Sequence, residues 1–101
     1  MLTILKSDAF DAWFDGLKDT VGRGRIADRI ERMSEGNFGD HKSVGDGIFE
    51  LRIAFGPGYR VYCLRHGASV VVLLAGGDKR SQDRDIKRAK QISRAWKETQ
   101  P

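Results

Sequence analysis

GPGYRVYCLR (Gly56–Arg65), followed closely by SVVVLLAGGDKR (Ser69–Arg80), decides the fold of this chain. The glycines on either side of Pro57 suit a tight turn, because glycine adopts positive φ freely and proline fixes the corner. Alternating apolar residues then predict a strand, and a second tight connection at His66 and Gly67 leads into an apolar strand expected at the centre of a sheet. The two stretches predict a hairpin with cations at its exits, which is a rigid platform for a phosphate.

A third strand precedes the turn, because the period of the apolar residues changes to two from residue 48. The run Leu2–Leu5 is consistent with an opening strand, and Gly76–Asp78 is expected to break the last one. We expect the hairpin and the third strand to form an antiparallel meander. In the third strand the alternation places Phe49, Leu51, Ile53 and Phe55 on one face and Ile48, Glu50 and Arg52 on the other. In the strand after the turn, Tyr59, Val61 and Cys63 share one face and Arg60, Tyr62 and Leu64 share the other.

Three helices accompany this sheet. Ser7 or Asp8 caps the first, the second follows a connection loosened by Gly22 and Gly24, and Ser81 is a possible cap for the third. The first two form a helical hairpin that must bury its apolar stripe against something larger. The stripes comprise Phe10, Trp13, Phe14 and Leu17, then Ile26, Ile30 and Met33, and finally Ile86, Ala89, Ile92 or Ser93, and Trp96. This order predicts an α+β fold, in which an N-terminal strand and a helical hairpin pack on an antiparallel sheet with a C-terminal helix.

Length and composition describe an ordinary folded chain. The 101 residues suit one domain over 1–101 with a modest core, and 40% of them are hydrophobic. No apolar run is long enough for a membrane span, and the first residues lack the pattern of a signal peptide, so we expect a cytoplasmic protein. The single cysteine, Cys63, lies in an apolar stretch and is interpreted as a small core residue.

The net charge of +4 arises mainly in the second half of the chain. This distribution fits a polyanionic partner, although a charged run is equally typical of a solvated helix face. Between residues 79 and 97 the cations are Lys79, Arg80, Arg84, Lys87, Arg88, Lys90, Arg94 and Lys97, against only Asp83 and Asp85.

A set of short motifs in this order resembles the RelE/HigB branch of the RelE/ParE superfamily of bacterial addiction-module toxins. The motifs are NFGDHKSVG (37–45), ELRI (50–53), GPGYRVY (56–62), GGDK (76–79), QD (82–83) and DIKRAK (85–90). The resemblance covers nearly the whole chain. It implies the toxin of a type II toxin-antitoxin module, with a compact toxin fold and cleavage of messenger RNA in the ribosomal decoding site.

Metal-free RNA cleavage needs cations for the phosphate, a base for the 2′-hydroxyl and an acid for the leaving 5′-oxygen. Arg60 is the first candidate for the phosphate, because its planar fork can hold two oxygens and a strand supports it rigidly. It also matches the arginine after the Gly-Tyr pair of the RelE pattern. The competing interpretation is an arginine that covers a sheet face and pairs with Glu50.

Lys79 and Arg80 lie between the last strand and the last helix, where cations and free helix N–H groups can meet a phosphate. Arg80 matches a RelE arginine in the basic loop after the last strand. Lys79 is a proton donor only if its pKa is lowered by its surroundings, and otherwise it clamps RNA. We expect Arg52, Arg80 and Arg84 to be RNA contacts.

The proton-transfer groups are less defined. Lys42 resembles a lysine of the RelE active surface, and His41 beside it is a candidate base or acid because histidine titrates near neutral pH; the alternative is an exposed loop histidine. His66, in a turn, is interpreted as structural. RelE carries a tyrosine a few residues beyond the basic loop, which this chain lacks. Asp83 either replaces it as a base or is a first-turn carboxylate favoured by the helix dipole.

Two other classes of function share this pattern. One is a ParE-like inhibitor of DNA gyrase without enzymatic activity, and the other is a basic RNA-binding module without catalysis. The set of cations favours the nuclease. Gly76–Gly77 is too short for a nucleotide-binding loop and the histidines and cysteine are scattered, so no cofactor or metal is expected. The expected partners are a cognate antitoxin, of the helix-turn-helix DNA-binding kind, the ribosome with its mRNA, and operator DNA through the toxin-antitoxin complex.

Overall fold

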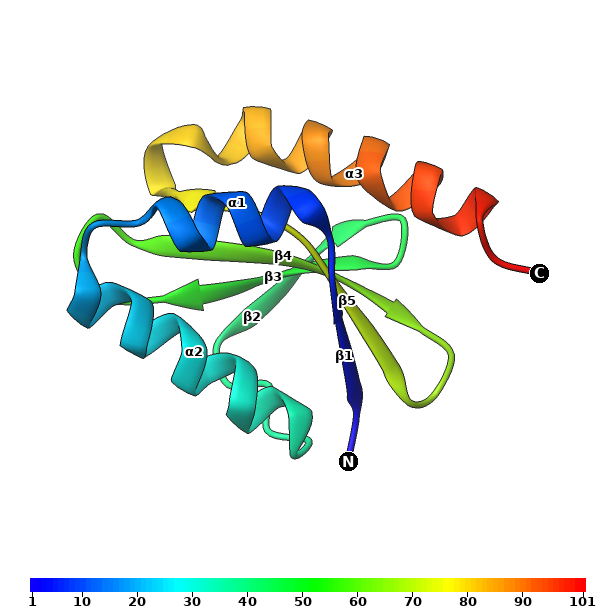
Figure 1. Cartoon of the computed structure of the whole chain (residues 1–101), viewed down its shortest axis with the longest axis horizontal. Coiled ribbons are helices and arrows are strands. Elements are labelled where there is room, and N and C mark those ends of the chain that lie inside the picture. The colour runs from blue at the N-terminus through cyan, green and yellow to red at the C-terminus, as the bar shows by residue number, and fades with distance from the viewer.

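A five-stranded sheet lies between two helical layers in the computed structural model, which describes residues 1–101 (Figure 1). The strand order is β1-β5-β4-β3-β2, so β1 and β2 form the two edges. β1 runs parallel to β5, and every other neighbouring pair is antiparallel. The strands are β1 (Thr3–Lys6), β2 (His41–Gly45), β3 (Ile48–Ile53), β4 (Tyr59–His66) and β5 (Val70–Asp78).

The helices divide between the two faces of the sheet. α1 (Asp8–Gly16) and α2 (Thr20–Ser34) cover one face, and α3 (Gln82–Glu98) covers the other after a single 3-10 turn, η1 (Lys79–Ser81). Ser7 caps α1 through its hydroxyl, which accepts the Phe10 N–H at 3.0 Å. The fold is therefore α+β with helices on both sides of a mixed sheet.

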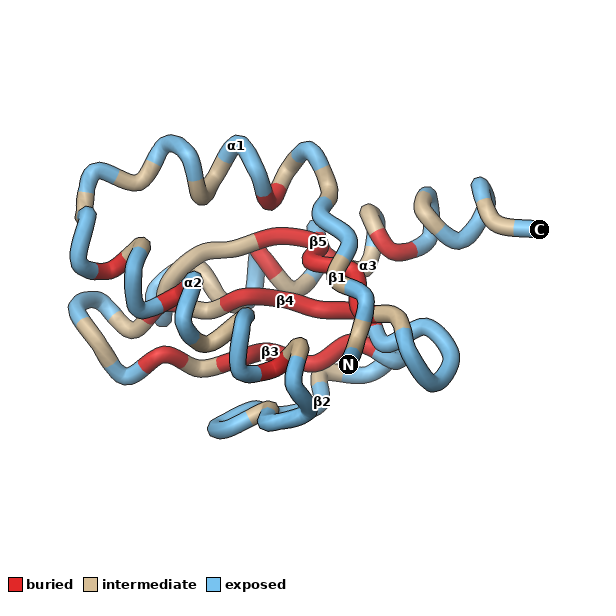
Figure 2. Tube along the Cα trace, turned by 60° about the horizontal axis from the view of Figure 1, so that its bottom comes forward, coloured by how far each residue is buried: buried red, intermediate tan, exposed pale blue.

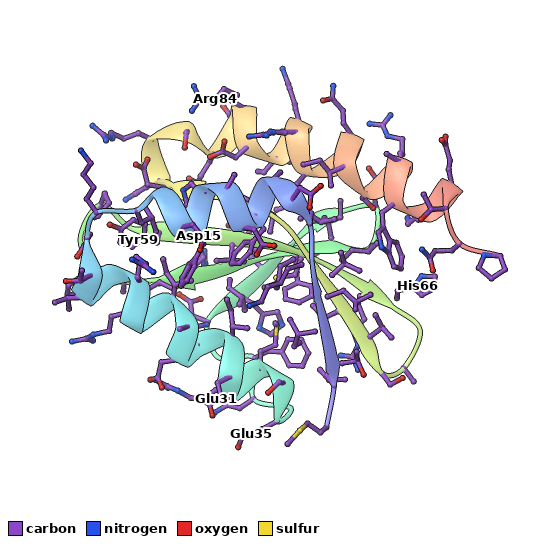
Figure 3. The ribbon with its side chains drawn as sticks, in the orientation of Figure 1. Asp15, Glu31, Glu35, Tyr59, His66 and Arg84 are labelled. Atoms are coloured by element: carbon purple, nitrogen blue, oxygen red, sulfur yellow. The ribbon has the colours of Figure 1, made fainter.

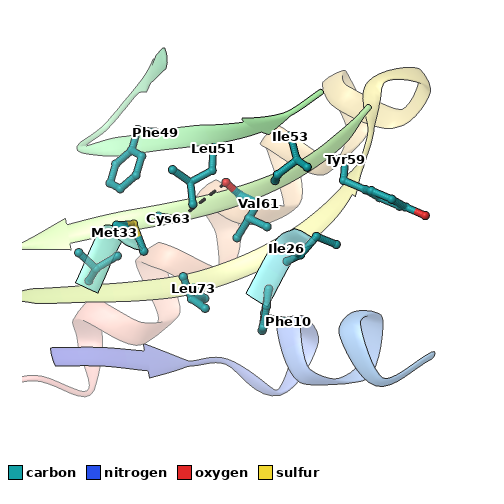
Figure 4. Close-up of a cluster of buried hydrophobic side chains, with 11 residues drawn as sticks. Phe10, Ile26, Met33, Phe49, Leu51, Ile53, Tyr59, Val61, Cys63 and Leu73 are labelled. Carbon is teal, nitrogen blue, oxygen red and sulfur yellow. Dashed lines mark hydrogen bonds between the residues drawn. The ribbon is translucent and has the colours of Figure 1, made fainter. Parts of the chain in front are cut away.

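Each face of the sheet has its own apolar core. Figure 2 shows the buried residues running along the central strands. The larger core joins α1 and α2 to the sheet, and Figure 4 shows it with Cys63 among its buried members. The smaller core lies under α3, and its buried members are Ile48, Tyr62, Leu64, Val72, Leu74, Ala75 and Ala89.

The alternation in the sequence predicted these two faces correctly. Phe49, Leu51 and Ile53 contribute to the larger core, whereas Ile48 belongs to the smaller one. The apolar run that begins at Val70 is a central strand buried on both faces, as predicted, because β5 lies between β1 and β4. The turn at 56–58 also forms as predicted, with both of its glycines at positive φ.

The predicted antiparallel meander is formed by β3, β4 and β5, whereas the pairing of the N-terminal strand was not predicted. β1 pairs in parallel with β5, which requires a long connection between the two strands. That connection contains α1, α2 and the strands β2 to β4. The strand β2 was also missed, since HKSVG has little apolar alternation. It pairs with β3 through a hairpin in which Asp46 and Gly47 both have positive φ, the geometry of a type I′ turn.

Two predictions about glycines were wrong. Gly22 and Gly24 lie inside α2, which begins at Thr20 after an Asp19 cap, so they do not form the connection. Gly76 and Gly77 do not break the last strand, which continues through Asp78.

None of the helices combines the length and the apolar character needed to cross a membrane.

Candidate functional site

Two adjacent rows of side chains cross the sheet beneath α3. The first row contains Arg52 and Arg60, whose α-carbons are paired between β3 and β4, followed by Gly77 on β5. The second row lies two residues further along the strands and contains Lys42, Glu50 and Tyr62, whose α-carbons are paired from β2 to β3 and from β3 to β4. A cationic row and a row with a buried carboxylate therefore lie side by side on the α3 face.

Arg60 is half-buried and its guanidinium curls back over the turn. Its Nη1 donates to the carbonyl oxygens of Gly58 at 3.1 Å and of Tyr59 at 3.2 Å. Its Nε is buried and has no protein partner, and Arg60 forms no ion pair with any carboxylate. The expected alternative, pairing with Glu50, does not occur. Arg60 is thus a cation held by backbone carbonyls and not neutralised by the fold.

The Lys79 side chain approaches Arg60 at the position that a side chain on residue 58 would occupy. A β-carbon built on Gly58 would lie 3.4 Å from both Arg60 Nη1 and Lys79 Cβ, which shows that the two side chains converge there. Lys79 is exposed and makes no ion pair. The φ of +80° at Gly58 suits glycine, so the turn both supplies the carbonyls for Arg60 and leaves room for Lys79.

These residues surround a hollow of about 380 Å³, here called the Arg60 hollow. It is lined by Asp40, Arg52, Arg60, Lys79 and the turn residues 54–58. Arg52 is paired with Asp40, to whose Oδ1 it donates from Nε at 3.1 Å and from Nη2 at 2.8 Å. Of the three cations, Arg60 and Lys79 are therefore free to bind an anion.

A larger hollow of about 670 Å³ lies beside it, formed by residues 78–84 and here called the α3 hollow. Arg80 and Arg84 are strongly exposed there, with only an ion pair of 3.5 Å from Arg80 to Asp78 and one of 3.8 Å from Arg84 to Asp85. Figure 3 shows Arg84 on the side of α3 that faces away from the sheet. Asp83 also lines this hollow but not the Arg60 hollow, and Lys79 lines both.

The structure separates His41 from Arg60. His41 is paired with Leu51, whose side chain belongs to the core under α1 and α2, so it lies on the opposite face from Arg60. Its ring packs against Phe38 and Phe49 at 5.5 and 5.8 Å, and its Nδ1 lies 2.9 Å from the Gly39 carbonyl oxygen. A carbonyl only accepts, so Nδ1 carries a proton in this arrangement. Lys42 is exposed on the α3 face.

His66 lies away from all of these residues. Its ring packs edge-on against Trp96 near the end of α3, with 4.9 Å between ring centroids. His66 is the last residue of β4 and not part of the turn, and its structural role stays a prediction.

A buried polar layer under the first turn of α3 was missed by the sequence analysis. Glu50 is 3% exposed and accepts a hydrogen bond from Gln82 Nε2 at 3.2 Å. Asp85 is 7% exposed and accepts from the Ser81 hydroxyl at 2.5 Å. The hydroxyl of Tyr62 is also buried and has no hydrogen-bond partner. The available signal was the period of two, which placed Glu50 with Arg52 in one strand and Tyr62 with Arg60 in the next. Nothing in the sequence showed that α3 would bury Glu50 and Tyr62.

The electrostatics of this layer keep Tyr62 neutral. Burial raises the pKa of its phenol well above the ordinary value, the carboxylates of Glu50 and Asp85 raise it further, and Arg60 acts in the opposite direction. The phenol is therefore a proton-bearing group over the whole physiological range.

Gly76 and Gly77 allow both helical layers to approach the end of β5. A β-carbon on Gly77 would overlap the Asp85 carboxylate, and one on Gly76 would overlap the Trp13 ring on the opposite face. The pair thus lets the first turn of α3 pack directly onto the strand beside Arg60, which fixes where Lys79 emerges.

Metal ligands are not grouped in this structure. No set of three or more His, Cys, Asp and Glu side chains is close enough to hold an ion. The expected absence of a cofactor stays a prediction.

The fold and the site together define a class, a small α+β domain that presents unpaired cations between a sheet and the first turn of its C-terminal helix. The chain belongs to the family described as Phage derived protein Gp49-like (DUF891), whose model matches residues 12–97. A protein of Haemophilus influenzae (strain ATCC 51907 / DSM 11121 / KW20 / Rd) named "Uncharacterized protein" is 54% identical over 84 residues, which make up 83% of this chain and 85% of the relative.

Proposed function

We propose that the chain is the toxin of a type II toxin-antitoxin module and a metal-independent endoribonuclease that cleaves messenger RNA on the ribosome. The observation that carries the proposal is the convergence of Arg60 and Lys79 on one hollow without any carboxylate paired to either. The resemblance of the motifs to RelE and HigB toxins supplies the substrate class. Membership of the Gp49-like family agrees with this assignment, because that family is related to RelE/ParE toxins.

The proposed reaction is a transesterification within the RNA backbone. The 2′-oxygen attacks the adjacent phosphorus as a base removes its proton, and the bond to the 5′-oxygen breaks as an acid protonates that oxygen. Arg60 binds the phosphate and stabilises the charge that develops on its oxygens, an interaction strongest in the transition state. Arg52, Arg80 and Arg84 hold neighbouring phosphates in the two hollows.

The proton-transfer roles fall to groups near the bound phosphate. Lys79 lines the same hollow as Arg60, and Asp83 lies in the adjoining α3 hollow. We therefore propose Lys79 as the acid and Asp83 as the base, with Lys42 as an RNA contact on the same face. His41 takes part only if the RNA also passes over the edge strand β2, since its ring is on the other face.

The proposal includes the surroundings of the protein. A toxin of this kind acts in the cytoplasm and must be neutralised by a cognate antitoxin, which we expect to cover the Arg60 hollow. Such antitoxins often carry a helix-turn-helix domain, so the complex would bind operator DNA. Its target would be the ribosome with mRNA in its decoding site.

The test is to map mRNA 5′ ends in a translating extract to which the wild-type chain or Arg60→Ala is added. The expected result is new ends within reading frames for the wild type and a loss of at least 100-fold for the variant, because one electrostatic contact to the transition state contributes about that factor. Arg32→Ala is the matched control, since this arginine is exposed on α2 and paired only with Asp28.

Each alternative function predicts a different result in the same extract. Intact messages together with arrested DNA supercoiling would establish a gyrase inhibitor in place of the nuclease. Salt-sensitive RNA binding without cleaved product would establish a binding module.

A further inference from the structure

Glu50 is a buried carboxylate without a cation. It is 3% exposed, and no lysine or arginine lies within ion-pairing distance of it. Its one side-chain hydrogen bond comes from a neutral amide, Gln82 Nε2, at 3.2 Å. A carboxylate removed from water with so little compensation is costly, and an apolar pair of similar size would join β3 to α3 at lower cost. The contact therefore calls for a role other than stability.

The segment that Gln82 belongs to carries Lys79. The 3-10 turn η1 (Lys79–Ser81) runs directly into α3 at Gln82. Its other side-chain hydrogen bonds are local in sequence: the Asp78 carboxylate at the end of β5 accepts the Arg80 N–H at 2.8 Å, and the Ser81 hydroxyl donates to Asp85 at 2.5 Å. Because Asp78 is the last residue of β5, the bonds to Asp78 hold the turn at the end of that strand but do not join it to β3.

The Glu50–Gln82 hydrogen bond adds a second tie, to a different strand. It is the side-chain bond that joins the segment to β3, and it spans 32 residues of sequence. β3 also carries Arg52, whose α-carbon is paired with that of Arg60. The hydrogen bond therefore restrains Lys79 relative to the pair of strands that carry the phosphate-binding arginines, in addition to the cap from Asp78 on β5 and the steric contact at Gly77.

We propose that Glu50 is a positioning residue for the reaction: through Gln82 it holds the η1 turn so that Lys79 lies beside Arg60. The inference rests on the proposed function and adds residues that the sequence analysis did not assign. Displacement of a catalytic group by about 1 Å costs on the order of 100-fold in rate, so a loosened turn should lower cleavage strongly.

The test is a set of variants measured by rate of mRNA cleavage and by midpoint of urea unfolding. Gln82→Ala is expected to lower cleavage by about 10- to 100-fold, whereas Gln91→Ala, the same change at an exposed position of α3, should leave it unchanged. Gln82→Glu places two carboxylates together and should be as harmful. The double variant E50Q/Q82E restores one amide and one carboxylate with the direction of the bond reversed, and it should recover most of the lost rate.

Coupling to Lys79 separates positioning from mere stabilisation. If Gln82 acts through Lys79, Gln82→Ala should change cleavage less than about 3-fold when Lys79 is already alanine, because effects on one pathway are not additive. A general loss of stability would lower the rate by the same factor in both backgrounds, and that result would overturn the proposal. So would failure of the folded E50Q/Q82E protein to recover.

The outcome also distinguishes this inference from the proposed function. Full activity in Gln82→Ala together with an inactive Arg60→Ala would reject the positioning role and leave the nuclease intact. Absence of cleavage by the wild type would reject both.

Discussion

Replacing Tyr62 by phenylalanine should stabilise the protein. Tyr62 is fully buried on β4, and its hydroxyl has no hydrogen-bond partner in the layer between the sheet and α3. The substitution removes a single oxygen and keeps the ring, so the packing of the ring in the smaller core is retained and only the volume of the hydroxyl is vacated. What changes is the cost of burying an unpaired polar group.

The size of the effect follows from that cost. A buried hydroxyl without a partner is unfavourable by about 1–3 kcal/mol, and some of this is offset by weak attraction to the nearby Glu50 and Asp85 carboxylates. We expect a net gain of about 1 kcal/mol in the free energy of unfolding. For a chain of this length that gain corresponds to a rise in Tm of about 4–8 °C.

Tyr59 provides the matched control on the same strand. Its side chain lies on the opposite face, and its hydroxyl donates to Asp19 Oδ2 at 2.7 Å. Tyr59→Phe breaks this charge-assisted bond and should therefore destabilise, so the two Tyr→Phe changes are expected to have opposite signs. Urea unfolding followed by fluorescence of Trp13 and Trp96 measures both. Equal destabilisation by the two changes would show that the Tyr62 hydroxyl has a partner and would refute the reasoning.

Three further predictions concern packing and pH. Gly77→Ala should cost about 1–3 kcal/mol in urea unfolding and also lower cleavage, because its β-carbon would overlap the Asp85 carboxylate and push away the start of α3. Hydrogen bonds from the Gly22 N–H and the Tyr59 hydroxyl lower the pKa of Asp19, so its contribution is present above the ordinary carboxyl pKa and is lost as pH falls through the lowered folded value; Asp19→Asn should flatten the acid limb of stability against pH. Burial raises the pKa of the Cys63 thiol, so the contribution of the thiol to stability should be fully present below its ordinary pKa of 9.0 and should fall as pH rises beyond that value. Cys63→Ala should be less stable at neutral pH, but its stability should depend less on pH in the alkaline range.

Local signals in the sequence predicted most of the fold. The period of two from residue 48 and the apolar spacing of the helices each express burial on one side of an element, which is a property of neighbouring residues. The strand β2 gave no such signal, because four of its five residues are exposed at the sheet edge and only Val44 is half-buried. The parallel pairing of β1 with β5 joins Thr3 to Val70, a contact that depends on the whole chain and not on local pattern.

The candidate site was predictable in part for the same reason. Arg60 was correctly placed on a strand beside the glycine turn, and the cations after the last strand were correctly placed at its exit, because both follow from local order. The Glu50–Gln82 hydrogen bond was not predictable, since it depends on how α3 crosses the sheet. The opposite sides taken by His41 and Lys42 follow from the alternation of β2, which became usable only when that strand was recognised.

The free cations are explained by what the nearby acids do. Four carboxylates around the site already have another donor that the fold supplies: Asp40 binds Arg52, Glu50 accepts from Gln82, Asp78 caps the η1 turn and Asp85 accepts from Ser81. None of them is therefore available to neutralise the pair. A chain that carries 14 acidic residues nevertheless leaves two cations unpaired at one hollow, because local hydrogen bonds engage the surrounding acids. An anion that enters the hollow meets a positive field without first having to displace an internal ion pair, which lowers the cost of binding a phosphate there.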